Sequence, residues 1–496
     1  MIILGLGGLH SDPACAVIRD GQLIAAVEEE KLRHPQPGTL PEHAIDACLK
    51  IAKCTAAEVE CVALARPFPS ELNIGVRARF PNARVVLVDH HEAHAASAFY
   101  LSPFETATVL TLDRYGDTRC GARWLGHGQA LTLDREAMYP DSLGDLYSRV
   151  TRGLGFEDNA DEHKLQWMSA AGQPRHKQAF LDGFSSDESN WLRLDSRRLP
   201  EGSAADVAAS LQAAVEEMVL RLAGAGENLC LAGGLFYNAM LVAALEASGA
   251  WQRIFVQPVA GDTGTALGAA CFAWHGAWHG KQQARIAFDT LALGPSFAAE
   301  EIKQVLENCK LRFRLLKTSD EVIEQAVRSL DEHKIIAWMQ DRMEFGPRAL
   351  GNRSILASPR DPYASENLNT YIKHREGFRK FAASVPAELA GEYFEVGDNA
   401  RHLATVGRVR PAYRVALASA LLDGDRVRVH TVSEAANPLY HRLLHAAGKT
   451  TGLPVLYNTS FNLFGDPLVC TPRDAVRSFY SSGIDAMFVG MFLLEK

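Results

Sequence analysis

The sequence lacks the features of several protein classes. Its nine cysteines are scattered, with no Cys-x-x-Cys pair and no regular spacing. We therefore expect reduced, mostly buried thiols and no disulfide framework. The N-terminal stretch MIILGLGGLHSDP has no basic leader, and its apolar run is far too short for a signal or membrane helix. We expect a cytoplasmic protein with no membrane partner.

Two further absences narrow the function. The net charge is −8, which argues against a nucleic-acid-binding surface as the main activity but allows a local basic pocket. The chain contains no GxxxxGK[ST] stretch, which excludes an ordinary P-loop. What remains is ordinary for a globular protein, since 47% of the 496 residues are hydrophobic and 22% charged. This length predicts two to four domains with ample core.

The first third of the chain repeats one pattern. IILGLGG is typical of a strand, and ACAVIRDGQLIAAVEEE predicts a hairpin that turns at Asp20 and Gly21. The stretches TATVLTLDRYGD and CGARWLGHGQALTL repeat this order of strand, polar turn and hairpin. The repetition predicts two related α/β lobes. A partly polar stretch closing on Gly-Pro-Ser near residues 290 to 300 predicts a boundary between domains 1–295 and 296–496.

The segment VDHHEAHAASAFY concentrates histidines in an expected helix. His90 and His94 lie four residues apart, on one helical face. Either one or two of the three histidines in this segment cap the helix and the rest face solvent, or His90 and His94 bind a metal together. Asp113 and Asp262 each follow an apolar strand and precede a turn, where aspartate also serves as a helix cap. As a set, two imidazoles and two carboxylates suit iron, manganese or zinc with open coordination positions.

Two other stretches indicate ligand binding. The pair Gly233–Gly234 and Asn238, in LAGGLFYN, either cradle a nucleotide or serve tight packing between helix and strand. Between residues 342 and 380 runs a dense set of cations, which is either a solvated helix face or an anion site. Because its arginines stand among Gly, Pro, Leu and Ile, we expect an anionic partner such as phosphate. The set is Arg342, Arg348, Arg353, Arg360, Lys373, Arg375, Arg379 and Lys380.

Six stretches, in this order along the chain, resemble one known family. They are HHEAHAASAFY, LAGGLFYN, GDTGTALGAA, RMEFGPRALGNRSILASPRDP, GFRKFAASV and PVLYNTSFNLFGDPLVCTP. Together they resemble the O-carbamoyltransferases of the nodulation-factor and antibiotic-tailoring (NodU/CmcH) family. The resemblance covers nearly the whole chain, and RMEFGPRALGNRSIL is its most specific part.

The resemblance implies an α/β fold in two parts. The N-terminal domain would be duplicated and actin-like (ASKHA-type), with a bound metal. The smaller C-terminal α/β domain would be similar to carbamoyl-adenylate synthases (YrdC-like). Such enzymes use carbamoyl phosphate and ATP, with Mg²⁺ expected alongside ATP. The C-terminal site forms carbamoyl-AMP, and the N-terminal site passes the carbamoyl group to a hydroxyl of a small molecule, a sugar or polyketide of secondary metabolism.

Residue by residue, the resemblance implies these roles. His90, His94, Asp113 and Asp262 would hold a divalent ion, with iron expected, and Asp113 would also be catalytic. His10 would lie near the acceptor as the catalytic base. Gly233, Gly234 and Asn238 would contact nucleotide, and the anion-binding residues would be Arg348, Lys373, Arg379, Arg428 and Ser460. Glu162 and Lys164 match a further family segment only loosely.

The chain departs from the family pattern in three places. Pro35, Gln36 and Pro37 stand where the family usually has a lysine. The segment before Arg428 lacks the family's histidine, so Arg426 is the alternative to Arg428. Arg114 stands beside Asp113, where glycine is commoner.

Two rival functions differ in class. A metallopeptidase would use His-x-x-x-His, but His91 stands where a His-Glu-x-x-His helix has its glutamate. A non-catalytic nucleotide-binding module would leave the basic run unexplained. The sequence names neither the acceptor nor the oligomeric state.

Overall fold

The computed structural model describes residues 1–35, 38–187, 190–195, 199–276, 284–463 and 465–496. The chain forms two compact units, Met1–Phe288 and Asp289–Lys496. Residues 289–295, which the sequence analysis left with the first domain, belong to the second unit. The Gly294 amide donates to the Met343 carbonyl (2.9 Å), and the Phe345 amide donates to Leu291 (2.8 Å).

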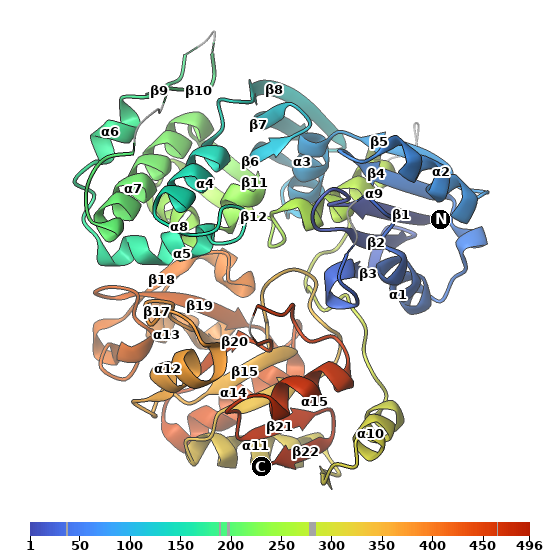
Figure 1. Cartoon of the computed structure of the whole chain (residues 1–496), viewed down its shortest axis with the longest axis vertical. Coiled ribbons are helices and arrows are strands. Elements are labelled where there is room, and N and C mark those ends of the chain that lie inside the picture. Colours follow the sequence, from blue (N-terminus) through green and yellow to red (C-terminus); the bar gives the residue numbers. More distant parts are fainter. Residues whose placement is uncertain (36–37, 188–189, 196–198, 277–283, 464) are drawn as a thin grey trace. The chain divides into compact units, whose positions relative to one another are not determined.

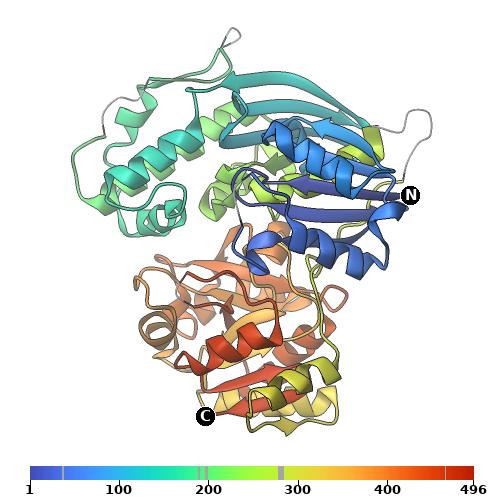
Figure 2. The ribbon, with the colours of Figure 1, turned by 45° about the vertical axis from the view of Figure 1, so that its right-hand side comes forward.

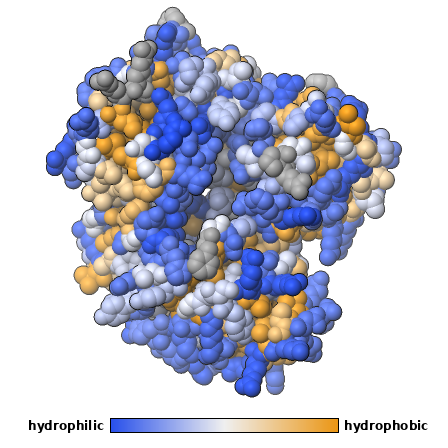
Figure 3. Space-filling view, in the orientation of Figure 1, coloured by the Kyte–Doolittle hydropathy of each residue, from blue (hydrophilic) through white to orange (hydrophobic). Residues whose placement is uncertain are grey.

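The distribution of hydrophobic residues bears on membrane contact and on the surface. Within the described residues, no helix has both the length and the apolar character needed to cross a membrane. On the face drawn in Figure 3, hydrophilic residues dominate, and hydrophobic residues gather in groups between them.

The first unit contains two five-stranded sheets of the same topology (Figure 1). Each begins with a three-stranded antiparallel meander, whose first strand then pairs in parallel with the fourth, and the fourth with the fifth. Figure 2 shows the long strands β6, β7 and β8 in teal. The first sheet is β3 (Gln22–Glu28), β2 (Ala14–Arg19), β1 (Ile2–Gly7), β4 (Cys61–Ala65) and β5 (Arg84–Val88). The second is β12 (Trp251–Val256), β11 (Gly226–Ala232), β6 (Thr106–Gly116), β7 (Arg119–His127) and β8 (Ala130–Met138). The predicted duplication is confirmed.

Two helices pack between these sheets. Helix α3 (His90–Leu101) follows β5 of the first sheet but packs on β6, β7 and β11 of the second. Helix α9 (Thr265–Gly276) follows β12 of the second sheet but packs on β1, β2 and β4 of the first. The remaining elements of the unit are α1 (Glu42–Ala52), α2 (Ser70–Arg79), α4 (Leu143–Gly153), α5 (Glu162–Met168), α6 (Lys177–Leu181), β9 (Phe184–Ser185), β10 (Arg193–Leu194), α7 (Ala204–Ala223) and α8 (Ala239–Ala247).

Helices α3 and α9 run side by side in the same direction. Asp262, just before α9, lies within 4 Å of His90 at the start of α3. Near the other ends of the two helices, the His275 ring stacks on Tyr100, with ring centroids 4.3 Å apart. A Cβ atom on Gly268 of α9 would stand 1.8 Å from the Ala93 carbonyl oxygen of α3. Glycine therefore lets the helices approach closely, and their N-termini meet at one place.

The second unit is a ten-stranded mixed sheet covered by helices. Its strands, in spatial order, are β13 (Arg314–Leu315), β22 (Phe492–Glu495), β21 (Ala486–Val489), β14 (Ile336–Met339), β15 (Arg353–Ala357), β20 (Leu456–Ser460), β16 (Ala382–Pro386), β19 (Arg426–Val432), β18 (Val406–Val409) and β17 (Phe394–Glu395). Its helices are α10 (Ala299–Asn308), α11 (Ser319–Asp331), α12 (Ala364–Asn367), α13 (Ala390–Tyr393), α14 (Pro438–Thr451) and α15 (Pro472–Tyr480).

Strand β14 shows how the core of this unit divides. Ile336 and Trp338 pack in one buried cluster with residues of α11 and α14. Ala337 and Met339 pack in a second cluster with residues of α10, α12 and α15. Successive side chains of a strand point to opposite faces, so the sheet is covered on both sides. The predicted class, α/β in a larger duplicated unit and a smaller second unit, is confirmed.

Candidate metal site and anion site

Four side chains converge at the paired N-termini of α3 and α9. The Nε2 atoms of His90 and His94 are 3.0 Å apart. Asp113 Oδ2 lies 3.6 Å from His90 Nε2 and 3.1 Å from His94 Nε2. Asp262 Oδ1 lies 3.6 and 3.9 Å from the same two nitrogens. The structure thus brings together the four residues that the sequence analysis grouped.

Asp113 reaches the cluster from within a strand, and the expectation that it follows its strand is wrong. Strand β6 continues to Gly116, but its pairing with β7 is irregular between Leu112 and Gly116. Such irregularities re-aim a side chain. The Ser142 hydroxyl also fixes this segment by donating to the Asp113 carbonyl (3.0 Å).

Neighbouring polar groups orient three of the four side chains, His90, Asp113 and Asp262. His90 Nδ1 lies 3.2 Å from the Arg66 carbonyl, which leaves Nε2 directed at the cluster. The Asp113 carboxylate accepts from the Arg114 amide (2.7 Å) and from the Gly234 amide (3.1 Å). The Ser11 hydroxyl donates to Asp262 Oδ2 (3.0 Å). Outer contacts of this kind fix the direction of metal ligands.

The histidines and aspartates of the cluster shift one another's pKa values. Burial by itself lowers the pKa of His90, but the hydrogen bond to Asp113 and the charges of Asp262 and Asp113 raise it to about 9. Burial would raise the pKa of Asp113, yet its hydrogen bonds to both histidines hold it well below its usual range. The carboxylates therefore favour positive charge at this point.

The donor set fits a divalent ion. Ligands about 2.1 Å from one ion stand about 3.0 to 3.4 Å apart, and the facing atoms here are separated by 3.0 to 3.9 Å. His90 and His94 are buried, while the Asp262 side chain is 33% exposed, which leaves one side open. Two neutral nitrogens and two carboxylates suit iron, manganese or zinc.

His91 does not belong to the cluster, and it does not face solvent, as one of the two alternatives for this segment required. All three histidines are buried. His91 Nδ1 lies 2.9 Å from the Thr111 hydroxyl, and Nε2 lies 3.1 Å from the Arg119 carbonyl. Burial, with the nearby His90 and His94, places the pKa of His91 well below its usual range. It is a neutral core residue.

The Gly-Gly stretch contacts the candidate metal site directly, through Asp113. Gly233 has φ of +97°, and a Cβ atom there would stand 2.2 Å from the Leu112 carbonyl oxygen of β6. This close approach lets the Gly234 amide reach Asp113. Asn238 caps α8, since its Oδ1 accepts from the Leu241 amide (3.0 Å). These contacts explain the residue types, and the nucleotide contact expected of all three stays a prediction.

The other residues expected in the first domain lie in different settings. His10 is exposed in the loop after β1, next to Ser11. Glu162 accepts from the Asn159 amide (2.7 Å), and Lys164 pairs with Asp161 (3.0 Å). No contact of Glu162 or Lys164 with the metal cluster is seen among the described residues.

Arg114, which replaces a commoner glycine, turns away from the cluster. Its guanidinium pairs with Asp145 (3.4 Å) and Asp158 (3.5 Å). Its backbone amide still donates to Asp113. The Arg114 side chain therefore pairs with acids outside the four-residue cluster.

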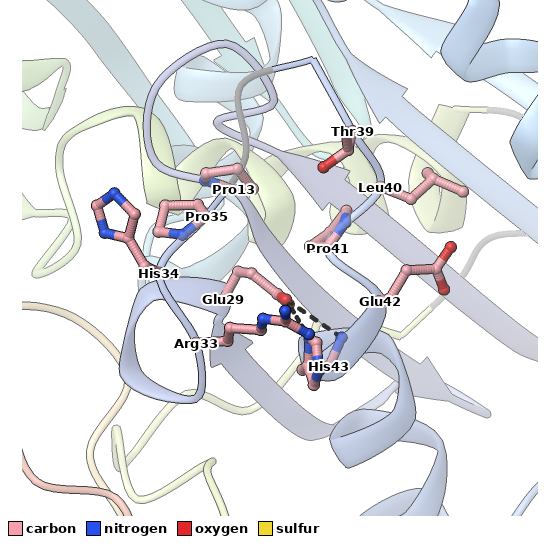
Figure 4. Close-up of a pocket in the computed structure, with 10 residues that line it drawn as sticks. All are labelled: Pro13, Glu29, Arg33, His34, Pro35, Thr39, Leu40, Pro41, Glu42 and His43. Atoms are coloured by element: carbon pink, nitrogen blue, oxygen red, sulfur yellow. Dashed lines mark hydrogen bonds and ion pairs between the residues drawn. The ribbon is translucent and has the colours of Figure 1, made fainter.

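A pocket of about 360 Å³ lies beside the loop after β1, which contributes Pro13 to its wall (Figure 4). The Glu29 carboxylate meets the imidazole of His43 (2.6 Å), as the dashed lines in Figure 4 show. Pro35, one of the residues that replace the family's lysine, lies in its wall, while Gln36 and Pro37 lie outside the described residues. The complete lining is Pro13, Glu29, Arg33, His34, Pro35, Thr39, Leu40, Pro41, Glu42 and His43.

In the second unit, Glu344 organises the loop that carries Arg348. Its buried carboxylate accepts from the amides of Leu350 (2.7 Å), Asn352 (2.8 Å) and Arg353 (3.2 Å). Gly351, with φ of +96°, packs so closely on the Tyr440 ring that a Cβ atom would stand 2.2 Å from it. In the stretch RMEFGPRALGNRSIL, the carboxylate of Glu344 thus fixes the backbone of the loop through three hydrogen bonds.

Lys373 lies at the end of a π-helical turn, η6 (Leu368–Lys373), against the loop after β20. Its Nζ donates to the Ser460 carbonyl (2.5 Å) and to the carbonyl and side chain of Asn462 (2.9 and 2.6 Å). Burial and the charges of Arg375 and Arg379 place its pKa well below the usual range. Lys373 therefore both holds the Ser460 segment and joins a group of like charges.

The cations of this group lower one another's pKa values. Burial lowers the pKa of Arg428 strongly, and Arg348, Arg375 and Arg379 lower it further. Burial and Arg379 lower the pKa of Arg375 to about 9. A bound anion would relieve this repulsion. Arg348, Lys373, Arg379, Arg428 and Ser460 thus lie in one neighbourhood. We call this group the anion site after the anion predicted to bind there, and the binding itself stays a prediction.

Arg375 also lies in this group, since its charge lowers the pKa values of Lys373 and Arg428. The basic run contained Arg375, but the expected set of anion-binding residues did not. Arg426, the alternative to Arg428, forms an ion pair with Asp423 in the preceding turn. The geometry therefore favours Arg428.

The rest of the basic run is divided among other tasks. Arg353 is fully buried and donates to the carbonyls of Gln340 (2.6 Å) and Pro295 (3.2 Å). Arg342 donates to Gly294 (3.0 Å), and Arg360 pairs with Asp331 (3.2 Å). The run is therefore not one solvated helix face.

Comparisons with known proteins bear on both units. The family model "Carbamoyltransferase N-terminus" matches residues 73–186 and 176–271, and "Carbamoyltransferase C-terminus" matches residues 327–496. An uncharacterized protein from Synechocystis sp. is 32% identical, over 100% of this chain and 96% of its own length. Nodulation protein NolNO from Sinorhizobium fredii is 32% identical, over 98% and 79%.

A relative with a named reaction also matches. The 3'-hydroxymethylcephem-O-carbamoyltransferase of Streptomyces clavuligerus is 30% identical, over 78% of this chain and 64% of its own length. The implied resemblance is therefore confirmed. The chain belongs to the NodU/CmcH carbamoyltransferase family and is a transferase.

Proposed function

We propose that the chain is an ATP-dependent O-carbamoyltransferase that works in two steps at two sites. The second unit (Asp289–Lys496) would make carbamoyl-AMP from carbamoyl phosphate and ATP. The first unit (Met1–Phe288) would transfer the carbamoyl group to a hydroxyl of a sugar or polyketide. The convergence of His90, His94, Asp113 and Asp262 in a carbamoyltransferase chain carries the proposal, because mixed-anhydride transfer needs an electrophilic site of this kind.

The first step needs cations around phosphate groups. Carbamoyl phosphate is hydrolysed to carbamate and phosphate, and the carbamate oxygen then attacks the α-phosphorus of ATP. Carbamoyl-AMP forms and pyrophosphate leaves, with Mg²⁺ expected on the ATP phosphates. The mutual repulsion in the anion site supports the assignment of Arg348, Arg375, Arg379 and Arg428 to these anions. Lys373 and Ser460 would shape the site through their contact with each other.

The second step needs a polarised carbonyl and a base. A divalent ion, with iron expected, would supply Lewis acidity at the four-ligand cluster when bound. Asp113 and Asp262 would neutralise charge there, and the amides of Arg114 and Gly234 would keep Asp113 in place. His10, exposed beside Ser11, would accept the proton of the acceptor hydroxyl. The expelled AMP carries the electron pair of the broken bond.

Two simpler functions make different predictions. A peptidase of the His-Glu-x-x-His type needs a base after its first histidine, whereas His91 is a neutral core residue. A nucleotide switch would hydrolyse ATP alone. Our proposal requires that ATP is consumed only when carbamoyl phosphate is present.

One experiment tests the division of labour. His90→Ala and Lys373→Ala are each assayed for pyrophosphate release from ATP and carbamoyl phosphate, and for hydrolysis of supplied carbamoyl-AMP or its transfer to hydroxylated compounds. His90→Ala should release pyrophosphate but lose transfer, and Lys373→Ala should do the opposite. Loss of a transition-state contact costs about 100- to 1000-fold, so the contrast is measurable. If both variants lose both half-reactions equally, the two-site scheme is wrong.

A further inference from the structure

A second histidine cluster lies in the second unit, on helix α14. His441 and His445 repeat the four-residue spacing of His90 and His94. Both Nε2 atoms face one oxygen of Glu388, at 2.8 and 2.7 Å. Their rings are 4.6 Å apart between centroids. This cluster plays no part in the proposed function.

The cluster is built on well-packed elements. Tyr440, Leu443 and Leu444 of α14 are fully buried against the sheet, and this fixes the direction of the adjacent helix face that carries His441 and His445. Glu388 lies in a helical turn, η7 (Ala387–Leu389), that begins directly after β16. Helix α14 packs on β16. The three side chains are therefore held by a helix and by the end of the strand beneath it.

The same side chains are accessible to solvent. His441 is 11% exposed, His445 37% and Glu388 52%. An ion could enter without any opening of the fold. Solvent could fill the remaining coordination positions, as it does in open zinc sites.

We propose that His441, His445 and Glu388 bind a divalent transition-metal ion of the zinc class. Two imidazoles and one carboxylate, with His at i and i+4 on a helix, form a donor set that zinc favours. The ion would lie between the three facing atoms, which must move apart only slightly from their present hydrogen-bond distances. Each imidazole would carry its proton on Nδ1 and offer Nε2 to the ion.

The site is a connection between elements, not a catalytic centre. Arg442 follows the first histidine, so the glutamate of a hydrolytic His-Glu-x-x-His helix is absent from this position. The bound ion would tie α14 to the segment that leaves β16. Because metal binding to the folded state adds to stability, zinc should raise the thermal midpoint of the protein.

Zinc titration of the full chain tests the proposal. Metal-free wild type, His94→Ala, His445→Ala and Glu388→Gln are titrated with Zn²⁺ by calorimetry at pH 7.5. Wild type should bind two ions, one at each cluster, and His94→Ala should lose the tight binding of one. His445→Ala and Glu388→Gln should each weaken the other ion at least about 100-fold, since loss of a mere outer contact already costs about 10- to 100-fold.

A matched control replaces a histidine outside both clusters. His127→Ala, at the exposed end of β7, should bind zinc as wild type does. Circular dichroism checks that each variant is folded, and Glu388→Gln keeps the size and shape of the side chain. If His445→Ala and Glu388→Gln bind zinc as wild type does, the site does not exist. His94→Ala reports separately on the cluster of the proposed function, so the two ideas fail independently.

Discussion

At the scale of single residues, the position of Arg348 depends on Glu344. The Glu344 carboxylate fixes the backbone on the C-terminal side of Arg348 through three amides. The guanidinium is then held near Arg428, whose pKa it lowers. An anion bound beside these cations would relieve their mutual repulsion.

We expect Arg348→Ala to reduce carbamoyl-AMP formation by about 100-fold or more, because a charged contact to the transferring phosphoryl group is lost. Arg348→Lys should recover only part of the rate if the contact is bidentate. The readout is pyrophosphate release at saturating ATP, with Arg360→Ala as a control from the same basic run. Full rescue by lysine would argue for a simple point charge.

Gly116 offers a way to disturb the metal cluster without removing a ligand. A Cβ atom there would stand 2.0 Å from the His90 ring. Gly116→Ala should therefore displace the imidazole and reduce bound metal markedly, as His94→Ala should do by losing a donor. Elemental analysis of the purified variants gives the result. Gly391→Ala, where a Cβ atom meets nothing within 4 Å, should keep its full metal content.

At the scale of elements, the pair α3 and α9 creates the candidate metal site. Each helix leaves one sheet and packs on the other, so the residues at their starts meet although they are far apart in the sequence. Close approach of the helices depends on Gly268 against the Ala93 carbonyl.

Gly268→Ala should therefore both destabilise the first unit and loosen the metal site. Overpacking of a tight core costs about 1 to 3 kcal/mol. We expect a lower midpoint in urea for the unfolding of the first unit and weaker metal binding in the same variant. The two effects should appear together. A variant with normal metal affinity but lower stability would show that the helix spacing does not control the ligands.

At the scale of the whole molecule, we expect three buried histidines to make the protein less stable in acid. Burial lowers the pKa of His402 and His430 to about 3 and that of His275 to about 4. In the unfolded chain a histidine has a pKa near 6.5, so the unfolded state binds more protons below that pH. The stability that these three histidines contribute is therefore complete above about pH 6.5 and declines as the pH falls toward 4 to 3.

Each such histidine removes up to about 1.4 kcal/mol per pH unit within this window. Urea unfolding at pH 7.5 and at pH 5.0 should show a clear loss at the lower pH. His430→Gln, which keeps a polar group near Ser384, should show a smaller difference between the two pH values. An unchanged difference would mean that His430 is protonated in the folded state.

The sequence by itself determined the local features of this protein. Alternation and turn residues predicted the hairpins and the duplicated lobes, and the spacing of His90 and His94 predicted a shared helical face. These features depend on neighbours within a few residues, which is why they can be found along the chain.

Only the tertiary structure decided which residues meet. It placed Arg353 in the core, where its guanidinium donates to backbone carbonyls, and placed Arg348, Arg375 and Arg428 together in the anion site. It turned Gly234 into a donor to Asp113, and it brought Glu388 to the histidines of α14. The physical reason is the same in each case. A functional site needs side chains that meet in space. The packing of helices and strands brings together residues that are far apart in the sequence, and no periodic pattern along the chain connects such residues.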